Sequence, residues 1–185
     1  MIKPKIGNTS DKLLTRIVIL LAVTTVVASA RDIRYDQTDL YRADEMSFDL
    51  FGTASLGKSS IEELSGDTID EDTEWGLGIG ANYFFTRNIG VGADAYTENS
   101  SGSFVDSASL NLIGRFPIGE SGFAPSVFGG GGRQFDNDEW WFCQVGGGIE
   151  YRFNRSTGVF LDGRVVWPEE TDYYGVVRLG VRFAF

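Results

Sequence analysis

The sequence of 185 residues contains no histidine, one cysteine and four prolines. Without histidine it cannot form a Ser-His-Asp triad, a Cys-His dyad, an imidazole zinc site or a histidine general base. Histidine is the commonest general base in enzymes, so its absence leads us to expect no enzymatic activity and no cofactor. The length suits one domain. A mean hydropathy of −0.09 also excludes a protein built from several membrane helices, although it is compatible with a membrane barrel.

Glycine and aromatic residues are abundant instead. The chain has 24 glycines, against a usual share of about 7%, together with 14 Phe, 7 Tyr and 4 Trp. This combination favours many short strands joined by tight turns.

Residues 1–30 have the pattern of a cleavable signal peptide. Ile17 to Val27 is an apolar stretch, shorter than the ~20 residues of a membrane-spanning helix, and small residues follow at Ala28 and Ala30. Basic residues precede it, namely Lys3, Lys5, Lys12 and Arg16. The alternative is an uncleaved anchor. The net charge is −10 for the whole chain, which makes nucleic acid a poor partner. Residues 31–45 form a polar leader of unassigned role before the first strand.

Alternation of apolar with polar or small residues predicts eight strands in residues 46–185. The predicted strands are Met46–Leu56, Trp75–Phe85, Ile89–Thr97, Phe104–Phe116, Phe123–Phe135, Trp141–Phe153, Val159–Trp167 and Tyr173–Phe185. The fifth is so rich in glycine that the pattern does not assign its faces. The sequence therefore predicts an all-β fold, an eight-stranded antiparallel up-and-down barrel.

Two features favour an apolar outer face in contact with lipid. Aromatic residues lie at the ends of the apolar faces, as in the girdles of outer-membrane barrels, and most runs have the ~9–11 residues that cross a bilayer. Short connections alternate with longer acidic ones, so that both termini lie on the short-turn side. The alternative is a secreted soluble barrel with an apolar ligand inside.

The same alternation predicts that charged side chains point into the lumen. They are Asp49, Asp94, Arg115, Glu150, Arg152, Asp162, Arg164, Arg178 and Arg182. Because eight strands enclose a space that side chains just fill, we expect an ion-pair network that plugs the barrel. The alternative is an ion path, which would make the protein a small diffusion pore.

Three further motifs are better explained without a binding or catalytic role. The first loop, residues 57–74, is acidic, and Asp67, Asp70, Glu71 and Asp72 are weak candidates for a divalent-cation site, although such runs are usually solvated. Gly52 to Ser59 matches the phosphate-binding loop pattern without the strand-to-helix context that the pattern requires. Cys143 falls on an apolar face, which favours an inert small side chain.

Residues 46–185 resemble the OmpA-like and OmpX-like eight-stranded outer-membrane barrels of the porin family. The most specific resemblance is the last strand, which ends the chain on an aromatic residue; the Pro125 and Gly129–Gly132 segment also resembles that family's fifth strand. In the family this terminal pattern is the signal for the barrel-assembly machinery, here Tyr173, Val177, Leu179, Val181, Phe183 and Phe185. The resemblance implies a monomer exported to a Gram-negative outer membrane, in contact with its lipid and lipopolysaccharide, with a structural or surface-interaction role.

Overall fold

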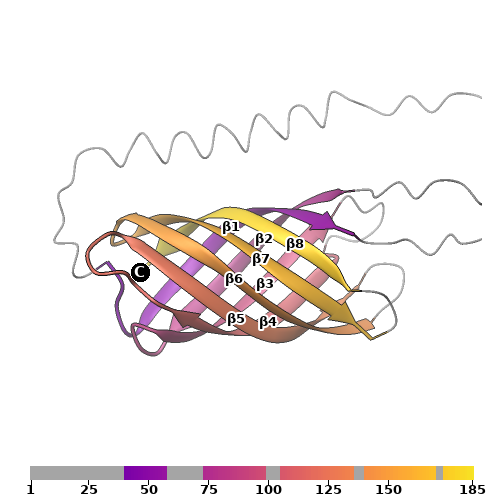
Figure 1. Cartoon of the computed structure of the whole chain (residues 1–185), viewed down its shortest axis with the longest axis horizontal. Coiled ribbons are helices and arrows are strands. Elements are labelled where there is room, and N and C mark those ends of the chain that lie inside the picture. Colours follow the sequence, from indigo (N-terminus) through magenta and orange to yellow (C-terminus); the bar gives the residue numbers. More distant parts are fainter. Residues whose placement is uncertain (1–39, 58–72, 99–104, 136–139, 170–172) are drawn as a thin grey trace, which may run out of the picture. The chain divides into compact units, whose positions relative to one another are not determined.

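The computed structural model describes residues 40–57, 73–98, 105–135, 140–169 and 173–185. The predicted signal peptide and residues 31–39 of the leader lie outside them. The described residues form eight strands (Figure 1). Their bounds are β1 Glu45–Leu56, β2 Glu74–Phe84, β3 Ile89–Glu98, β4 Ser107–Arg115, β5 Phe123–Gln134, β6 Trp140–Asn154, β7 Thr157–Pro168 and β8 Tyr174–Ala184. No helix among these residues is long and apolar enough to cross a membrane.

Each strand pairs antiparallel with the next, and β8 pairs with β1 to close the barrel. The closing ladder runs from Ser47 opposite Ala184 to Leu56 opposite Gly175. Figure 1 shows the strands tilted steeply around the common axis. Closure pairs the edges that an open sheet would expose. The predicted eight-stranded up-and-down barrel is confirmed.

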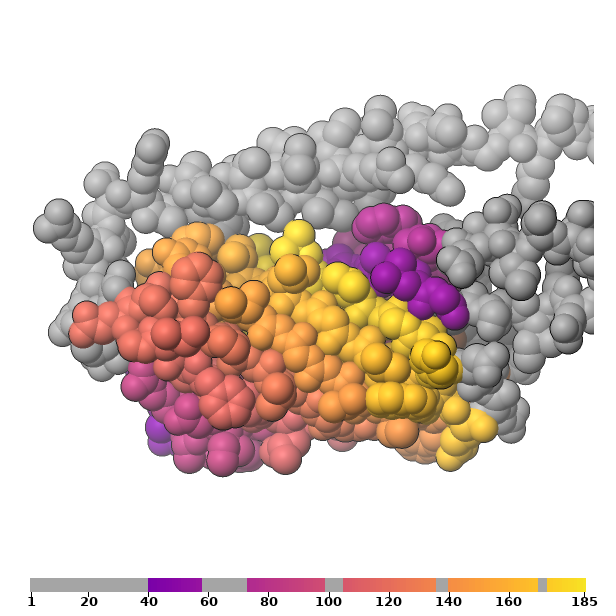
Figure 2. Space-filling view, in the orientation of Figure 1, coloured from indigo at the N-terminus to yellow at the C-terminus, as the bar shows by residue number. Residues whose placement is uncertain are grey.

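Large apolar side chains cover the outside of the barrel. Trp75 is 65% exposed, Leu110 70% and Leu179 54%, and they alternate along their strands with buried or half-buried neighbours. Figure 2 shows one side of this surface, where side chains of β5 to β8 form a continuous cover. The inward positions are mostly polar. An apolar exterior around a polar lumen is the reverse of a soluble barrel that carries an apolar ligand.

The short turns gather at one end of the barrel. They join β2 to β3, β4 to β5 and β6 to β7, and β1 begins and β8 ends there as well. Strand β1 begins at Glu45, one residue earlier than the alternation predicted, so Glu45 belongs to the barrel and not to the polar leader. The three short connections favour local antiparallel pairing, which sets the register of every inward side chain.

The structure shows which residues of strand β5 face the lumen and which face outward, an assignment that the sequence did not provide. Ala124, Phe128 and Gln134 are buried in the lumen, whereas Phe123 and Val127 face outward. Four consecutive glycines leave no side-chain pattern to read in this strand, and the register with β4 and β6 settles which face is which.

Candidate functional site

A first cluster of ion pairs fills the short-turn end of the lumen. Glu45 lies at its centre: Nη1 of Arg115 and Nη2 of Arg152 each lie 2.7 Å from its Oε1. Both arginines and Glu45 are almost completely buried. These side chains come from β1, β4 and β6, so the cluster spans the barrel.

The same cluster extends from the short-turn end farther into the lumen through Glu150. Its carboxylate accepts hydrogen bonds from Nε of Arg152 and Nη1 of Arg182, both at 2.6 Å. Arg182 in turn forms a two-pronged contact with Asp49, with both nitrogen–oxygen distances at 2.7 Å. Bidentate pairs of this kind fix orientation as well as charge.

A second cluster occupies the lumen nearer the long loops. Asp94 lies 3.2 Å from both Arg164 and Arg178, and Arg178 pairs with Asp162 at 2.8 Å. A cavity of about 30 Å³ lies between the clusters and is lined by members of both, among them Asp49 and Asp94. A space of that size holds no more than a few water molecules.

The two clusters balance in charge. Five carboxylates face five guanidinium groups, and every one of the nine lumen residues singled out in the sequence lies in one of them, with Glu45 as the tenth member. A buried charge is costly unless it is paired and hydrogen-bonded. The pairing therefore explains how so many ionised groups share one narrow lumen.

Uncharged side chains occupy the space between the ion pairs. Asn111 donates to Asp94 at 3.1 Å, and Gln144 donates to Asn111 at 2.7 Å. Aromatic rings fill the rest: the guanidinium of Arg178 lies 4.7 Å from the ring centre of Phe51, which meets Phe160 edge-on. Phe51 lies between Asp49 and Thr53 on the inward face of β1 and is buried in the lumen with them.

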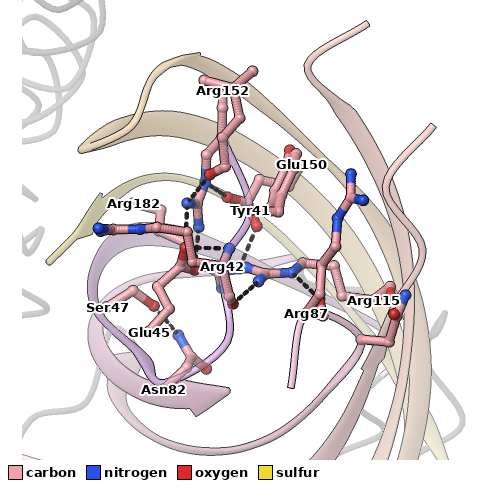
Figure 3. A network of polar contacts seen from close by, with 12 residues as sticks. Tyr41, Arg42, Glu45, Ser47, Asn82, Arg87, Arg115, Glu150, Arg152 and Arg182 are labelled. Atoms are coloured by element: carbon pink, nitrogen blue, oxygen red, sulfur yellow. Dashed lines mark hydrogen bonds and ion pairs between the residues drawn. The ribbon is translucent and has the colours of Figure 1, made fainter. Parts of the chain in front are cut away.

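A residue ahead of the first strand covers the first cluster. The ring of Tyr41 lies between Arg115 and Arg152, with its centre 4.7 and 4.6 Å from their guanidinium carbons (Figure 3). Its hydroxyl donates to the carbonyl of Gly122 at 2.8 Å, in the turn between β4 and β5. Burial raises the pKa of the Tyr41 phenol, so the group remains a neutral donor. The residues just before β1, which include Tyr41, thus cross the mouth of the barrel at its short-turn end.

Sequence reasoning missed both Tyr41 and Glu45. For Glu45 a signal existed, because Glu45, Ser47 and Asp49 alternate in step and so share the inward face. For Tyr41 there was none, because its partner Gly122 is 81 residues away in the chain.

Other predicted sites receive different outcomes. The weak cation candidates Asp67, Asp70, Glu71 and Asp72 lie outside the described residues. Gly52 to Leu56, the first half of the phosphate-loop match, is antiparallel strand, so it lacks the parallel strand-to-helix setting. Cys143 is exposed on the outer face. No group of metal-binding side chains occurs within the described segments.

The residues proposed as an assembly signal lie on and beside β8. Val177 and Leu179 are exposed on the outer face, and Val181 on the same face is covered by its neighbours. Tyr173 and Phe185, which the sequence placed in the strand, lie one residue beyond its two ends. Phe185 is 72% exposed, and its backbone N–H donates to the carbonyl of Met46 on β1.

Comparison with solved structures identifies the class of fold. The N-terminal β-barrel domain of Pseudomonas aeruginosa OprF superposes with a TM-score of 0.60 and 17% identity, covering 78% of this chain and 99% of that one. Neisserial surface protein A matches with a TM-score of 0.57 and 14% identity over 76% of this chain and 97% of its own. Ail of Yersinia pestis matches at 0.55 and 15% identity, over 77% and 99%.

No family model matches the chain, and no curated protein matches it. The structural likeness therefore carries the classification: the chain has the fold of the eight-stranded outer-membrane barrels, which is the fold that the sequence resemblance implied.

Proposed function

We propose that this protein is an integral outer-membrane barrel whose lumen is closed and whose role is structural or interactive at the cell surface. One observation carries the proposal: large apolar side chains face outward, while inside the lumen five carboxylates and five guanidinium groups form two clusters of ion pairs. An apolar exterior of this extent is stable in lipid and not in water. The resemblance of residues 1–30 to a signal peptide supports export.

Closure of the lumen rests on three layers. Tyr41 covers the short-turn mouth, the two ion-pair clusters follow, and Phe142, Val166 and Val176 pack together toward the long loops. The cavity of about 30 Å³ between the clusters is too small for a solute path. These layers favour a plugged barrel over a diffusion pore.

The surface role rests on the loops between the strands. Ail is described as an attachment and invasion protein, and one of its structures contains a heparin analogue. We do not extend that polyanionic ligand to this chain, because residues 57–74 carry seven acidic residues and would repel it. The acidic loops instead favour a cationic partner or a hydrated surface.

Recordings in planar lipid bilayers test the closed lumen. We expect the folded protein to insert without stable, large conductance steps. As a positive control, a solved porin is recorded in the same bilayer. Uniform ohmic steps from the folded protein would contradict the plugged lumen and favour the pore.

A further inference from the structure

Residues 40–44, which we call the strap, connect the seam of the barrel with its opposite wall. The strap leads directly into β1, which pairs with β8 along the seam. Leu40 and Tyr41, its first two residues, contact β4, β5, β6 and the turn between β4 and β5. In the strand order of the closed barrel, β4 and β5 lie farthest from the seam. The strap therefore joins two opposite sides of the barrel across the short-turn mouth.

The far end of the strap is held by both its backbone and its side chains. Nη1 of Arg152 donates to the carbonyl of Leu40 at 2.6 Å. Leu40 and Tyr41 are 3% and 5% exposed and pack with Ala124 on β5. Figure 3 shows Tyr41 beside Arg152, on the side of the lumen where Arg115 also lies. The strap thus fits a site built by three neighbouring strands.

The turn between β4 and β5 offers a fixed acceptor to the strap. Gly122 has a φ of 77°, a conformation that glycine adopts readily. Its carbonyl accepts from the backbone N–H of Arg152 at 2.9 Å and from the hydroxyl of Tyr41 at 2.8 Å. A Cβ at Gly122 would lie 2.9 Å from the carbonyl oxygen of Arg152. Local pairing of β5 with β6 therefore sets this acceptor without help from the strap.

The near end of the strap bends sharply into β1. Asp44 is the one residue other than glycine, within the ranges that the structure describes, with a positive φ, at 53°. This conformation is unfavourable for most residues, although aspartate tolerates it better than others. Its carboxylate accepts from the hydroxyl of Tyr83 on β2 at 3.1 Å. Because the bend itself is unfavourable, contacts at the far end must hold the strap across the mouth.

Those contacts join residues that are distant in the chain. The partners of Tyr41 and Leu40 at Gly122 and Arg152 are 81 and 112 residues away. Docking of the strap on an open sheet would have to close a loop of that length for a few contacts, which is entropically costly. Once β1 has paired with β8, the ladder between them has already met that cost.

We propose that the strap docks only after β1 and β8 have paired, and that it then slows the opening of the seam. Its contacts are absent from the transition state of folding and present in the closed barrel. Loss of such contacts speeds unfolding and leaves the folding rate unchanged. The strap is therefore a device for kinetic stability, distinct from the ion pairs that fill the lumen.

Rates of refolding into lipid vesicles and of unfolding in urea, both followed by tryptophan fluorescence, test the order of these events. Tyr41→Ala removes the ring and the hydrogen bond at the far end of the strap. We expect it to unfold about a hundredfold faster than the wild type or more, and to refold within about twofold of the wild-type rate. Refolding slowed as much as unfolding is accelerated would overturn the proposal, because the strap would then take part in closure.

A milder variant keeps the test open if Tyr41→Ala fails to fold. Tyr41→Phe removes only the hydrogen bond to Gly122 and should unfold about two- to tenfold faster, again with an unchanged refolding rate. Tyr151→Phe, which removes a hydroxyl from the outer face of β6, is the matched control and should change neither rate. Equal unfolding rates for Tyr41→Phe and Tyr151→Phe would contradict a strap that holds the seam.

Discussion

Glu45 links the two arginines at the short-turn mouth. Among the described residues it is the one carboxylate within ion-pair distance of Arg115, and it also accepts from Arg152. A buried ion pair contributes little net stability compared with an apolar replacement, but removal of one partner leaves a buried charge uncompensated. Glu45 should therefore be a sensitive position.

Glu45→Gln should lower the free energy of unfolding by about 3–5 kcal/mol, because Arg115 loses its carboxylate in a buried setting. Urea unfolding in lipid vesicles, followed by tryptophan fluorescence, measures the change. Glu120→Gln, in the exposed turn between β4 and β5, should stay within about 0.5 kcal/mol of the wild type. Matching values for the two variants would show that Glu45 has no special role.

Two variants of Tyr41 distinguish the contribution of its hydrogen bond from that of its ring packing. Tyr41→Phe removes only the bond to Gly122 and should cost about 0.5–1.5 kcal/mol. Tyr41→Ala also removes the ring between the two arginines and should cost about 3–5 kcal/mol. The same unfolding assay compares them, with Tyr151→Phe on the outer face as a control. If Tyr41→Ala unfolds like the wild type, the segment does not hold the mouth closed.

In strand β5, glycines of the same sequence motif have different surroundings on the two faces of the sheet. Gly130 and Gly132 face a lumen crowded by β4, whereas Gly129 and Gly131 face the outer surface, where an added Cβ would meet its nearest atom at 3.5 and 3.1 Å. The sequence could not distinguish them, because glycine has no side chain to carry a pattern. The structure distinguishes them by what an added Cβ would meet.

Gly130→Ala should prevent or strongly weaken folding, because its Cβ would overlap the backbone of β4. Gly129→Ala should fold nearly as well as the wild type, since its Cβ makes only ordinary contacts. The yield of SDS-resistant barrel after refolding into vesicles compares the two. Equal yields would mean that β5 is oriented differently from the structure.

Strand β8 carries the predicted signal for the barrel-assembly machinery. Phe185→Ala should reduce the amount of folded barrel in cells while leaving refolding of the purified chain into vesicles unchanged, because the residue is 72% exposed beyond the strand. Phe153→Ala, an aromatic residue at the same end of β6, is the control. Parallel losses in cells and in vesicles would assign Phe185 to stability and not to recognition.

Local patterns predicted most of this barrel. Alternation located all eight strands and placed the nine charged residues inward, because a strand projects its side chains to opposite faces with a period of two. The Tyr41 contact, the orientation of β5 and the cavity between the clusters depend on register and on contacts across the barrel. Those features arise only after closure, so a reading of neighbouring residues could not provide them.

The direction of the apolar face is the central claim, since the lipid contact and the closed lumen both follow from it. The decisive measurement is the mobility of the detergent-extracted envelope fraction on SDS gels, boiled and unboiled. A closed membrane barrel resists SDS because every strand is paired. The account predicts a heat-dependent shift in that fraction. A protein released in the soluble periplasm, with no shift, would contradict it.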